Sequence, residues 1–158
     1  MILYLLEPEV AGELGSNTII DNFDSVRQRG ERPNITYLHY QFTGWLGDEL
    51  LECTPCFIVT ESLAKTIQES ELEGYVLEDV EVSVSDEFKE LYPDTELPKF
   101  KRLIPKGYVE IDGQNYRLWS RDDFCLAQKS YLVVTEKVLS VLKSHKISYC
   151  DISPLDKT

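Results

Sequence analysis

The sequence predicts an α+β fold, in which a few short amphipathic helices pack on a mixed or mainly antiparallel sheet. Three observations carry this prediction. Short runs are rich in β-branched and aromatic residues, helix-capping residues follow some of these runs, and Gly, Pro and Asp mark turns between them. With 158 residues, 42% of them hydrophobic and 11% aromatic, the chain has the size and composition to bury one core. We therefore treat residues 1–158 as a single domain.

The first third of the chain combines strands with a long polar segment. Residues 2–6 and residues 35–42 are expected to form strands, because they are apolar or rich in β-branched and aromatic types. Residues 12–34 are polar and contain three glycines, so we expect mainly loop with one short helix. In residues 43–52 two glycines flank a tryptophan, which predicts a turn followed by a short helical turn.

The middle of the chain alternates strands and helices. Residues 57–59 are expected to form a buried strand, after which Thr60 caps an amphipathic helix. In residues 75–85 valines alternate with acidic and hydroxyl residues, which is typical of a half-buried strand. Ser85 is expected to cap another short helix that ends near Pro93. Asp112-Gly113 predicts a hairpin between residues 108–111 and residues 114–119.

Two segments of the chain resemble each other at an offset of 75 residues. Phe57-Ile58-Val59-Thr60-Glu61 matches Leu132-Val133-Val134-Thr135-Glu136, and apolar positions of the following helices match as well. One explanation is that short strand–helix units resemble one another by chance. The other is that two related β-α-β units pack on one sheet.

The charge is strongly negative, with 28 acidic and 16 basic residues and a net charge of −12. Residues 61–96 hold twelve acids and only two lysines, whereas residues 97–146 hold ten bases and five acids. Such a charge repels nucleic acids and anionic membranes and attracts basic proteins over a long range. The acidic segment is either a solvated surface or a docking face for a basic partner.

Two tryptophans lie beside acids, Trp45 near Asp48 and Glu49, and Trp119 near Asp122 and Asp123. They are either core residues or aromatic anchors rimmed by carboxylates, as in interfaces with basic proteins. The candidate partner-binding residues are therefore Trp45, Asp48, Glu49, Glu69, Glu71, Glu73, Glu78, Asp79, Glu81, Asp86, Glu87 and Glu90.

Catalytic and metal-binding motifs are weak. Cys53-Thr54-Pro55-Cys56 precedes a predicted strand, whereas a redox C-x-x-C motif opens a helix that lowers the thiol pKa. A zinc site would need Cys53 and Cys56 together with Cys125 and His39 from distant parts of the chain. Asp48 and Glu52 could share a helix face, but two carboxylates make a weak cation site. The chain has no phosphate-binding loop and no nucleophile elbow, so we expect no catalytic residues and no cofactor.

The opening apolar run of six residues is too short and lacks the basic start of a secretory signal, so we expect a cytoplasmic protein with reduced cysteines. The sequence leaves the oligomeric state open, including a homodimer.

The run from Tyr131 to Leu139, followed by Ile147 and residues 151–155, resembles the C-terminal end of some bacterial immunity proteins. Residues 39–60, with Gly44-Trp45-Leu46-Gly47-Asp48 at their centre, are similar to part of such proteins. The resemblance implies an inhibitor that neutralises a cognate toxin domain by tight, non-catalytic binding. The alternatives are a small metal-binding or enzymatic protein that uses the Cys53/Cys56 pair and, less supported, a self-assembling structural protein.

Overall fold

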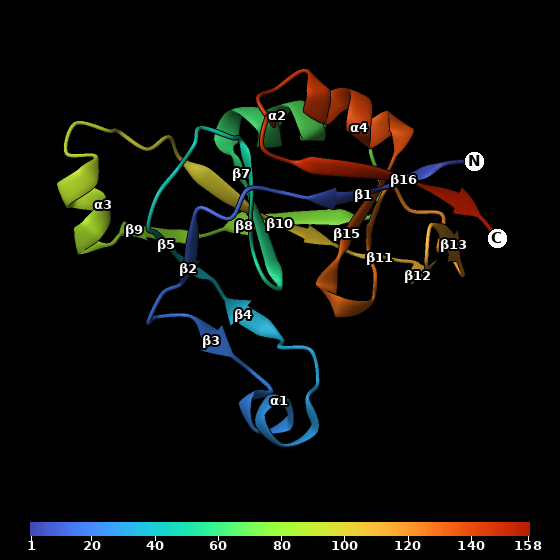
Figure 1. The fold of residues 1–158 in the computed structure, drawn as a ribbon, viewed down its shortest axis with the longest axis horizontal. Helices are drawn as coiled ribbons and strands as arrows, with labels where there is room; N and C mark the ends of the chain where they lie inside the picture. Colours follow the sequence, from blue (N-terminus) through green and yellow to red (C-terminus); the bar gives the residue numbers. More distant parts are fainter.

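The fold is α+β, as the sequence predicts, and the computed structural model describes all residues from 1 to 158 (Figure 1). Its elements follow in the order β1 (Leu3–Glu7), β2 (Gly12–Leu14), β3 (Ile19–Ile20), α1 (Phe23–Arg29), β4 (Ile35–Tyr37), β5 (His39–Phe42), β6 (Leu50–Cys53), β7 (Cys56–Thr60), α2 (Glu61–Glu69), β8 (Tyr75–Asp79), β9 (Glu81–Val84), α3 (Asp86–Leu91), β10 (Phe100–Pro105), β11 (Gly107–Tyr108), β12 (Glu110–Asp112), β13 (Asn115–Arg117), β14 (Phe124–Leu126), the 3-10 turn Gln128–Ser130, β15 (Leu132–Thr135), α4 (Glu136–Lys143) and β16 (Asp151–Lys157).

Two sheets dominate the structure, and they have the same internal order. One sheet runs β11-β14-β15-β1-β16-β13-β12 and the other runs β6-β7-β10-β8. The segment β14-β15-β1-β16 therefore repeats the order β6-β7-β10-β8. In the first, β7, α2 and β8 form a β-α-β unit, and β10 lies between the two strands and antiparallel to both. In the second, β15, α4 and β16 form such a unit, and β1 lies between its strands in the same way. We call β6, β7, α2 and β8 the first repeat, and β14, β15, α4 and β16 the second repeat.

The strand inserted into each repeat comes from the part of the chain that precedes the other repeat. β1, at the start of the chain, pairs with β15 and β16, and Leu3 lies opposite Thr135. β10, which precedes the second repeat, pairs with β7 and β8, and Phe100 lies opposite Thr60. The two repeats thus exchange strands, which ties them into one body.

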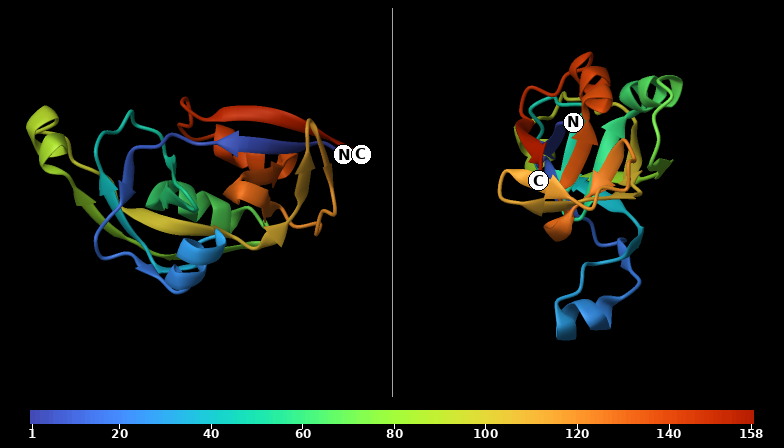
Figure 2. Two further views of the ribbon diagram at one scale, coloured as in Figure 1. Left: turned by 60° about the horizontal axis from the view of Figure 1, so that its bottom comes forward. Right: turned by 90° about the vertical axis from the view of Figure 1, so that its right-hand side faces the viewer.

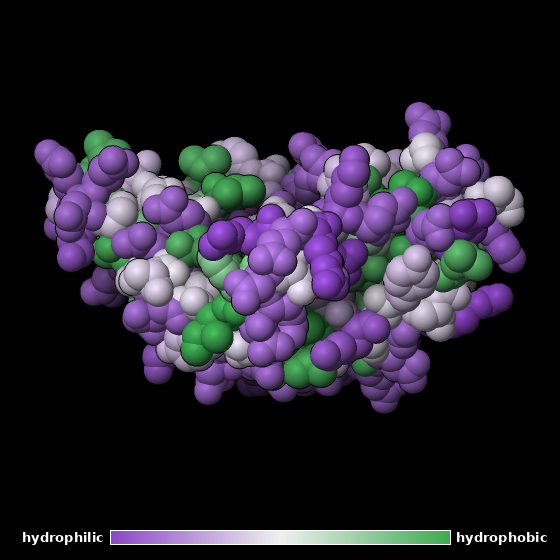
Figure 3. All heavy atoms as spheres, turned by 90° about the horizontal axis from the view of Figure 1, so that it is seen from below, coloured by the Kyte–Doolittle hydropathy of each residue, from purple (hydrophilic) through white to green (hydrophobic).

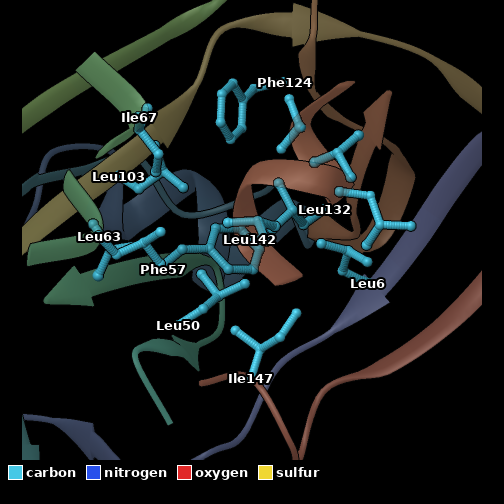
Figure 4. Close-up of a cluster of buried hydrophobic side chains, with 14 of the residues drawn as sticks. Leu6, Leu50, Phe57, Leu63, Ile67, Leu103, Phe124, Leu132, Leu142 and Ile147 are labelled. Carbon is cyan, nitrogen blue, oxygen red and sulfur yellow. The ribbon is translucent and has the colours of Figure 1, made fainter. Parts of the chain in front are cut away.

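The largest core cluster lies between the two repeats and is built from equivalent positions of both (Figure 4). Its sixteen buried residues fall into the pairs Leu6/Leu103, Leu50/Phe124, Phe57/Leu132, Val59/Val134, Leu63/Val138, Ala64/Leu139, Ile67/Leu142 and Leu72/Ile147. The 75-residue similarity in the sequence therefore reflects two related β-α-β units, but these units lie in two sheets and not on the one sheet that the second explanation assumed. Because both repeats supply this core, neither buries a comparable core alone.

Both repeats start their helix in the same way. The side chain of Thr60 accepts a hydrogen bond from the amide of Leu63 at 3.2 Å, and that of Thr135 accepts one from Val138 at 3.4 Å. These are N-caps of the predicted kind. The two helices contact each other on one side of the molecule, as Figure 1 shows.

The equivalence extends to hairpins that precede each repeat, β2–β5 and β12–β13, in which the strands pair antiparallel. The predicted hairpin is present, but its two-residue turn is Gly113-Gln114 and not Asp112-Gly113, because Asp112 already pairs with Asn115. In the first hairpin, residues 15–38 replace this turn and form an arm with β3, α1 and β4. The arm projects from the body (Figure 2), and no residue of α1 is buried.

Three predictions of local structure are corrected. Residues 43–49 form a loop that leads into strand β6, so the helical turn predicted in residues 43–52 is absent. The strand predicted over residues 35–42 is split at Leu38, which is buried in a second core cluster. The strand predicted over residues 75–85 is split at Val80, because β8 pairs with β10 while β9 pairs with β5.

Candidate protein-binding site

Trp45 stabilises a loop and is half-buried. Its indole Nε1 donates a hydrogen bond to the carbonyl of Asp48 at 2.9 Å, and its ring meets Phe100 edge to face. In the equivalent loop, Trp119 donates from Nε1 to the carbonyl of Asp122 at 3.0 Å. Both tryptophans therefore hold the turn that leads into the first strand of a repeat.

Asp48 is fully buried, so its assignment to a partner-binding surface is corrected. Its Oδ2 accepts a hydrogen bond from the amide of Tyr149 at 2.7 Å, which joins the loop before β6 to the loop before β16. Its Oδ1 has no hydrogen-bond partner. A buried carboxylate oxygen without a partner is costly, and it adds negative potential to its surroundings.

Glu49 is likewise committed to internal contacts. Its carboxylate accepts hydrogen bonds from the Thr60 hydroxyl at 2.7 Å and from the amide of Lys146 at 3.0 Å, and it lies 3.1 Å from Nδ1 of His145. Burial raises the pKa of the Glu49 carboxyl, but these hydrogen bonds and the His145 charge together bring it below its ordinary value. Glu49 therefore joins helix α2 to the end of α4, and is not free to bind a partner.

The other predicted acids do not share one face. Glu69, Glu71 and Glu73 are exposed at the end of α2 and beyond it, Glu78 and Asp79 are exposed on β8, and Asp86, Glu87 and Glu90 are exposed on α3, which lies at one end of the molecule (Figure 1). Glu81 accepts hydrogen bonds from the Tyr37 hydroxyl and the Asn17 amide.

Nearby lysines compensate part of this charge. A surface groove of about 710 Å³ between α2 and β8 contains Glu61, Glu78 and Asp79, but also Lys65 and Lys101. Lys101 pairs with Asp79 at 2.6 Å. This groove therefore has mixed charge.

A second hollow has a different character. It has a volume of about 470 Å³ and lies where the end of β1, the start of β16 and strand β6 meet. Four carboxylates and two tyrosines line it, with no basic residue among the lining side chains: Glu7, Glu9, Glu52, Asp151, Tyr131 and Tyr149. None of the four acids forms an ion pair within the protein. We call this the acidic pocket.

Two acids of the pocket, Glu7 and Glu52, repel each other. Burial raises the pKa of the Glu52 carboxyl to about 7, and the charge of Glu7 adds to this effect. Glu9 is almost fully buried, and it accepts hydrogen bonds from the amides of Leu46 at 2.7 Å and Asp48 at 3.3 Å. The buried Asp48 carboxylate thus lies directly behind the residues that line the pocket.

Sequence reasoning missed the acidic pocket. Its acids come from positions 7, 9, 52 and 151, and only the exchange of strand β1 into the second repeat brings Glu7 beside Asp151. Charge counted along the chain points instead to residues 61–96. No pattern in the sequence would have joined these four residues.

The cysteines are free and do not gather into one site. Cys53 and Cys56 face each other across the β6–β7 hairpin, whereas Cys125 belongs to another core cluster. Burial raises the pKa of Cys53 to about 12 and that of Cys125 to about 11, and it also raises the pKa of Cys56. Thiols with such pKa values are protonated and weakly nucleophilic at neutral pH.

Comparison with protein families, with curated proteins and with solved structures finds no match to this chain. None of the four helices has the length and apolar character needed to cross a membrane. The face seen in Figure 3 is mostly hydrophilic, with hydrophobic side chains in small, separate patches.

Proposed function

We propose that this protein is an acidic, non-catalytic binding protein that neutralises the basic toxin domain of a cognate bacterial toxin, as an immunity protein does. The observation that carries the proposal is the acidic pocket, a hollow with no cation among its lining residues, in which the carboxylates of Glu7, Glu52 and Asp151 have no counterion while that of Glu9 accepts hydrogen bonds from two backbone amides. Charges left without a counterion within one protein are well placed to be compensated by a second protein.

The surroundings of the titratable side chains also favour binding over catalysis. His39 is buried, and its Nε2 lies 2.7 Å from the Ser83 hydroxyl. Its Nδ1 accepts a hydrogen bond from the backbone amide of Asn17 at 3.2 Å. His145 is held between Thr66 and Glu49. These histidines have structural partners, and the raised thiol pKa values disfavour a cysteine nucleophile.

The net charge of −12 supports the same proposal. Many toxin domains of this kind are cationic nucleases, and an acidic inhibitor covers a surface meant for phosphate. Complementary charge raises the rate at which the two proteins meet, and added salt lowers that rate.

The test is co-expression with the product of the upstream gene, as the candidate toxin, followed by affinity capture at low and at high salt. We expect cells to survive and a one-to-one complex to be captured at low salt, because the acidic surface neutralises a basic one. A matched culture with the toxin domain alone controls for toxicity. Cell death in both cultures, with no complex, would refute the proposal.

A further inference from the structure

We infer that the acidic pocket receives an arginine side chain of the basic partner, held between carboxylates and the rings of Tyr131 and Tyr149. The inference rests on the proposed function, because it names the chemistry by which that partner is recognised. The pocket offers negative charge and exposed aromatic surface, two properties that suit a guanidinium group, and its volume of about 470 Å³ leaves room for an arginine side chain.

The two repeats provide an internal comparison for the pocket. The positions equivalent to Glu7, Glu52 and Asp151 are Ile104, Leu126 and Val76, as the strand registers show. The position equivalent to Glu9 lies at Lys106–Gly107. The equivalent place in the fold, formed by β10, β8 and β14, therefore has no acid at these positions, so the fold does not require acids there.

The clustered acids also cost the free protein stability. Glu7 and Asp151 lie directly opposite each other on antiparallel strands, which is an unfavourable position for like charges. The buried Oδ1 of Asp48 lacks a hydrogen-bond partner just behind the lining of the pocket. A cation seated in the pocket would offset the repulsion between Glu7 and Asp151.

A guanidinium fits this lining better than an ammonium group. It is planar, it stacks on aromatic rings, and it donates paired hydrogen bonds to carboxylates. Tyr131 and Tyr149 are 37% and 51% exposed, so their rings are open to a partner. Glu7 and Asp151 are exposed beside them and can accept such bonds.

The experiment titrates the isolated protein with N-acetyl-arginine amide and follows backbone amide shifts by NMR. N-acetyl-lysine amide and the neutral isostere N-acetyl-citrulline amide serve as matched probes. The titration is run at about pH 8, above the Glu52 pKa of about 7, where the double variant Glu52→Gln/Asp151→Asn removes about the same charge from the pocket as Glu87→Gln/Glu90→Gln removes from helix α3. The pocket variant is expected to fold, because the positions equivalent to Glu52 and Asp151 are occupied by the uncharged residues Leu126 and Val76.

We expect saturable shifts at residues 7–10, 46–52 and 149–151, with a dissociation constant on the order of millimolar for one side chain. Binding should weaken at least about threefold for the lysine probe and in the pocket variant, and stay unchanged in the α3 variant. Shifts that never saturate, that spread equally over α3, or that citrulline reproduces would overturn the inference. Equal binding of lysine would overturn the assignment to arginine. Since this titration contains no toxin, its failure leaves co-expression as a separate test of neutralisation.

Discussion

Glu7 and Asp151 lie directly opposite each other on the antiparallel strands β1 and β16, although 144 positions separate them in the chain. Both side chains are exposed, and neither has a cation in ion-pair distance. This arrangement exists only because β1 crosses into the second repeat. The strand exchange is therefore what brings these two residues of the candidate site together.

Removal of one of these two charges should stabilise the free protein. We expect Asp151→Asn to raise the free energy of unfolding by about 0.5 kcal/mol, because like charges directly opposite in a sheet repel. Urea unfolding at low salt measures this change. Glu87→Gln on α3 is the matched control and should not stabilise the protein, because Glu87 lies in the first turn of that helix, where an acid is favourable; an equal or larger gain there would assign the effect to net charge instead of the pair.

Glu52 should make stability fall as pH rises. Its pKa is about 7 in the folded protein, against an ordinary value of 4.5, so the folded state binds more protons in the window between these values. The free energy of unfolding from this group is therefore highest below that window and declines through it. We expect Glu52→Gln to remove this decline, a gain of about 1 kcal/mol above pH 7 once solvent screening is included.

The measurement is a series of urea unfolding curves from pH 4.5 to pH 8 for both proteins. The other acids that line the pocket, Glu7, Glu9 and Asp151, are present in both proteins. Parallel stability profiles would show that Glu52 titrates in its ordinary range.

The two helix caps should contribute similar amounts to the free energy of unfolding. Thr60 and Thr135 each accept a cap hydrogen bond, and each hydroxyl also donates to a carboxylate, Glu49 at 2.7 Å and Asp123 at 2.9 Å. We expect Thr60→Ala and Thr135→Ala each to cost about 2 kcal/mol, because the cap is lost and a carboxylate loses its donor.

The serine variants are the controls for these caps, since serine keeps the hydroxyl group. Chemical denaturation of the four variants gives the comparison. Serine variants as unstable as the alanine variants would mean that the methyl group, and not the hydrogen bonds, matters at these positions.

The exchanged strands predict how fragments behave. A chain cut between residues 96 and 97 separates β1 from the second repeat and β10 from the first. We expect each fragment alone to lack cooperative unfolding, and the equimolar mixture to regain it, because each supplies the strand missing from the other's sheet. Circular dichroism during heating tests this expectation, and cooperative melting of either fragment by itself would contradict it.

The sequence reveals the local elements better than their arrangement. The cap at Thr60, the cap at Ser85 and the apolar stripe of α2 depend on near neighbours, and these predictions are confirmed. The 75-residue similarity is visible as well, because equivalent core positions keep similar apolar residues. Charge counting, in contrast, cannot separate the exposed Asp79 from the buried Asp48, since burial depends on contacts with distant segments.

The strand exchange explains why the candidate site was missed. Nothing in residues 2–6 indicates that this strand pairs with β15 and β16 at the far end of the chain. Without that pairing, Glu7, Glu52 and Asp151 are three unrelated acids. The arm formed by residues 15–38 also interrupts the β2–β5 hairpin that precedes the first repeat. The similarity between this hairpin and β12–β13 is therefore hidden in the sequence.

The most direct test of an acidic binding function is the association rate constant with the cognate toxin domain, measured by stopped flow from about 50 mM to 500 mM salt. The proposal predicts a rate that falls at least about tenfold over this range, and a smaller fall for Glu52→Gln/Asp151→Asn, because opposite charges steer the encounter. A rate constant that does not depend on salt, or a pocket variant with the same salt dependence as the wild type, would contradict recognition through the acidic pocket.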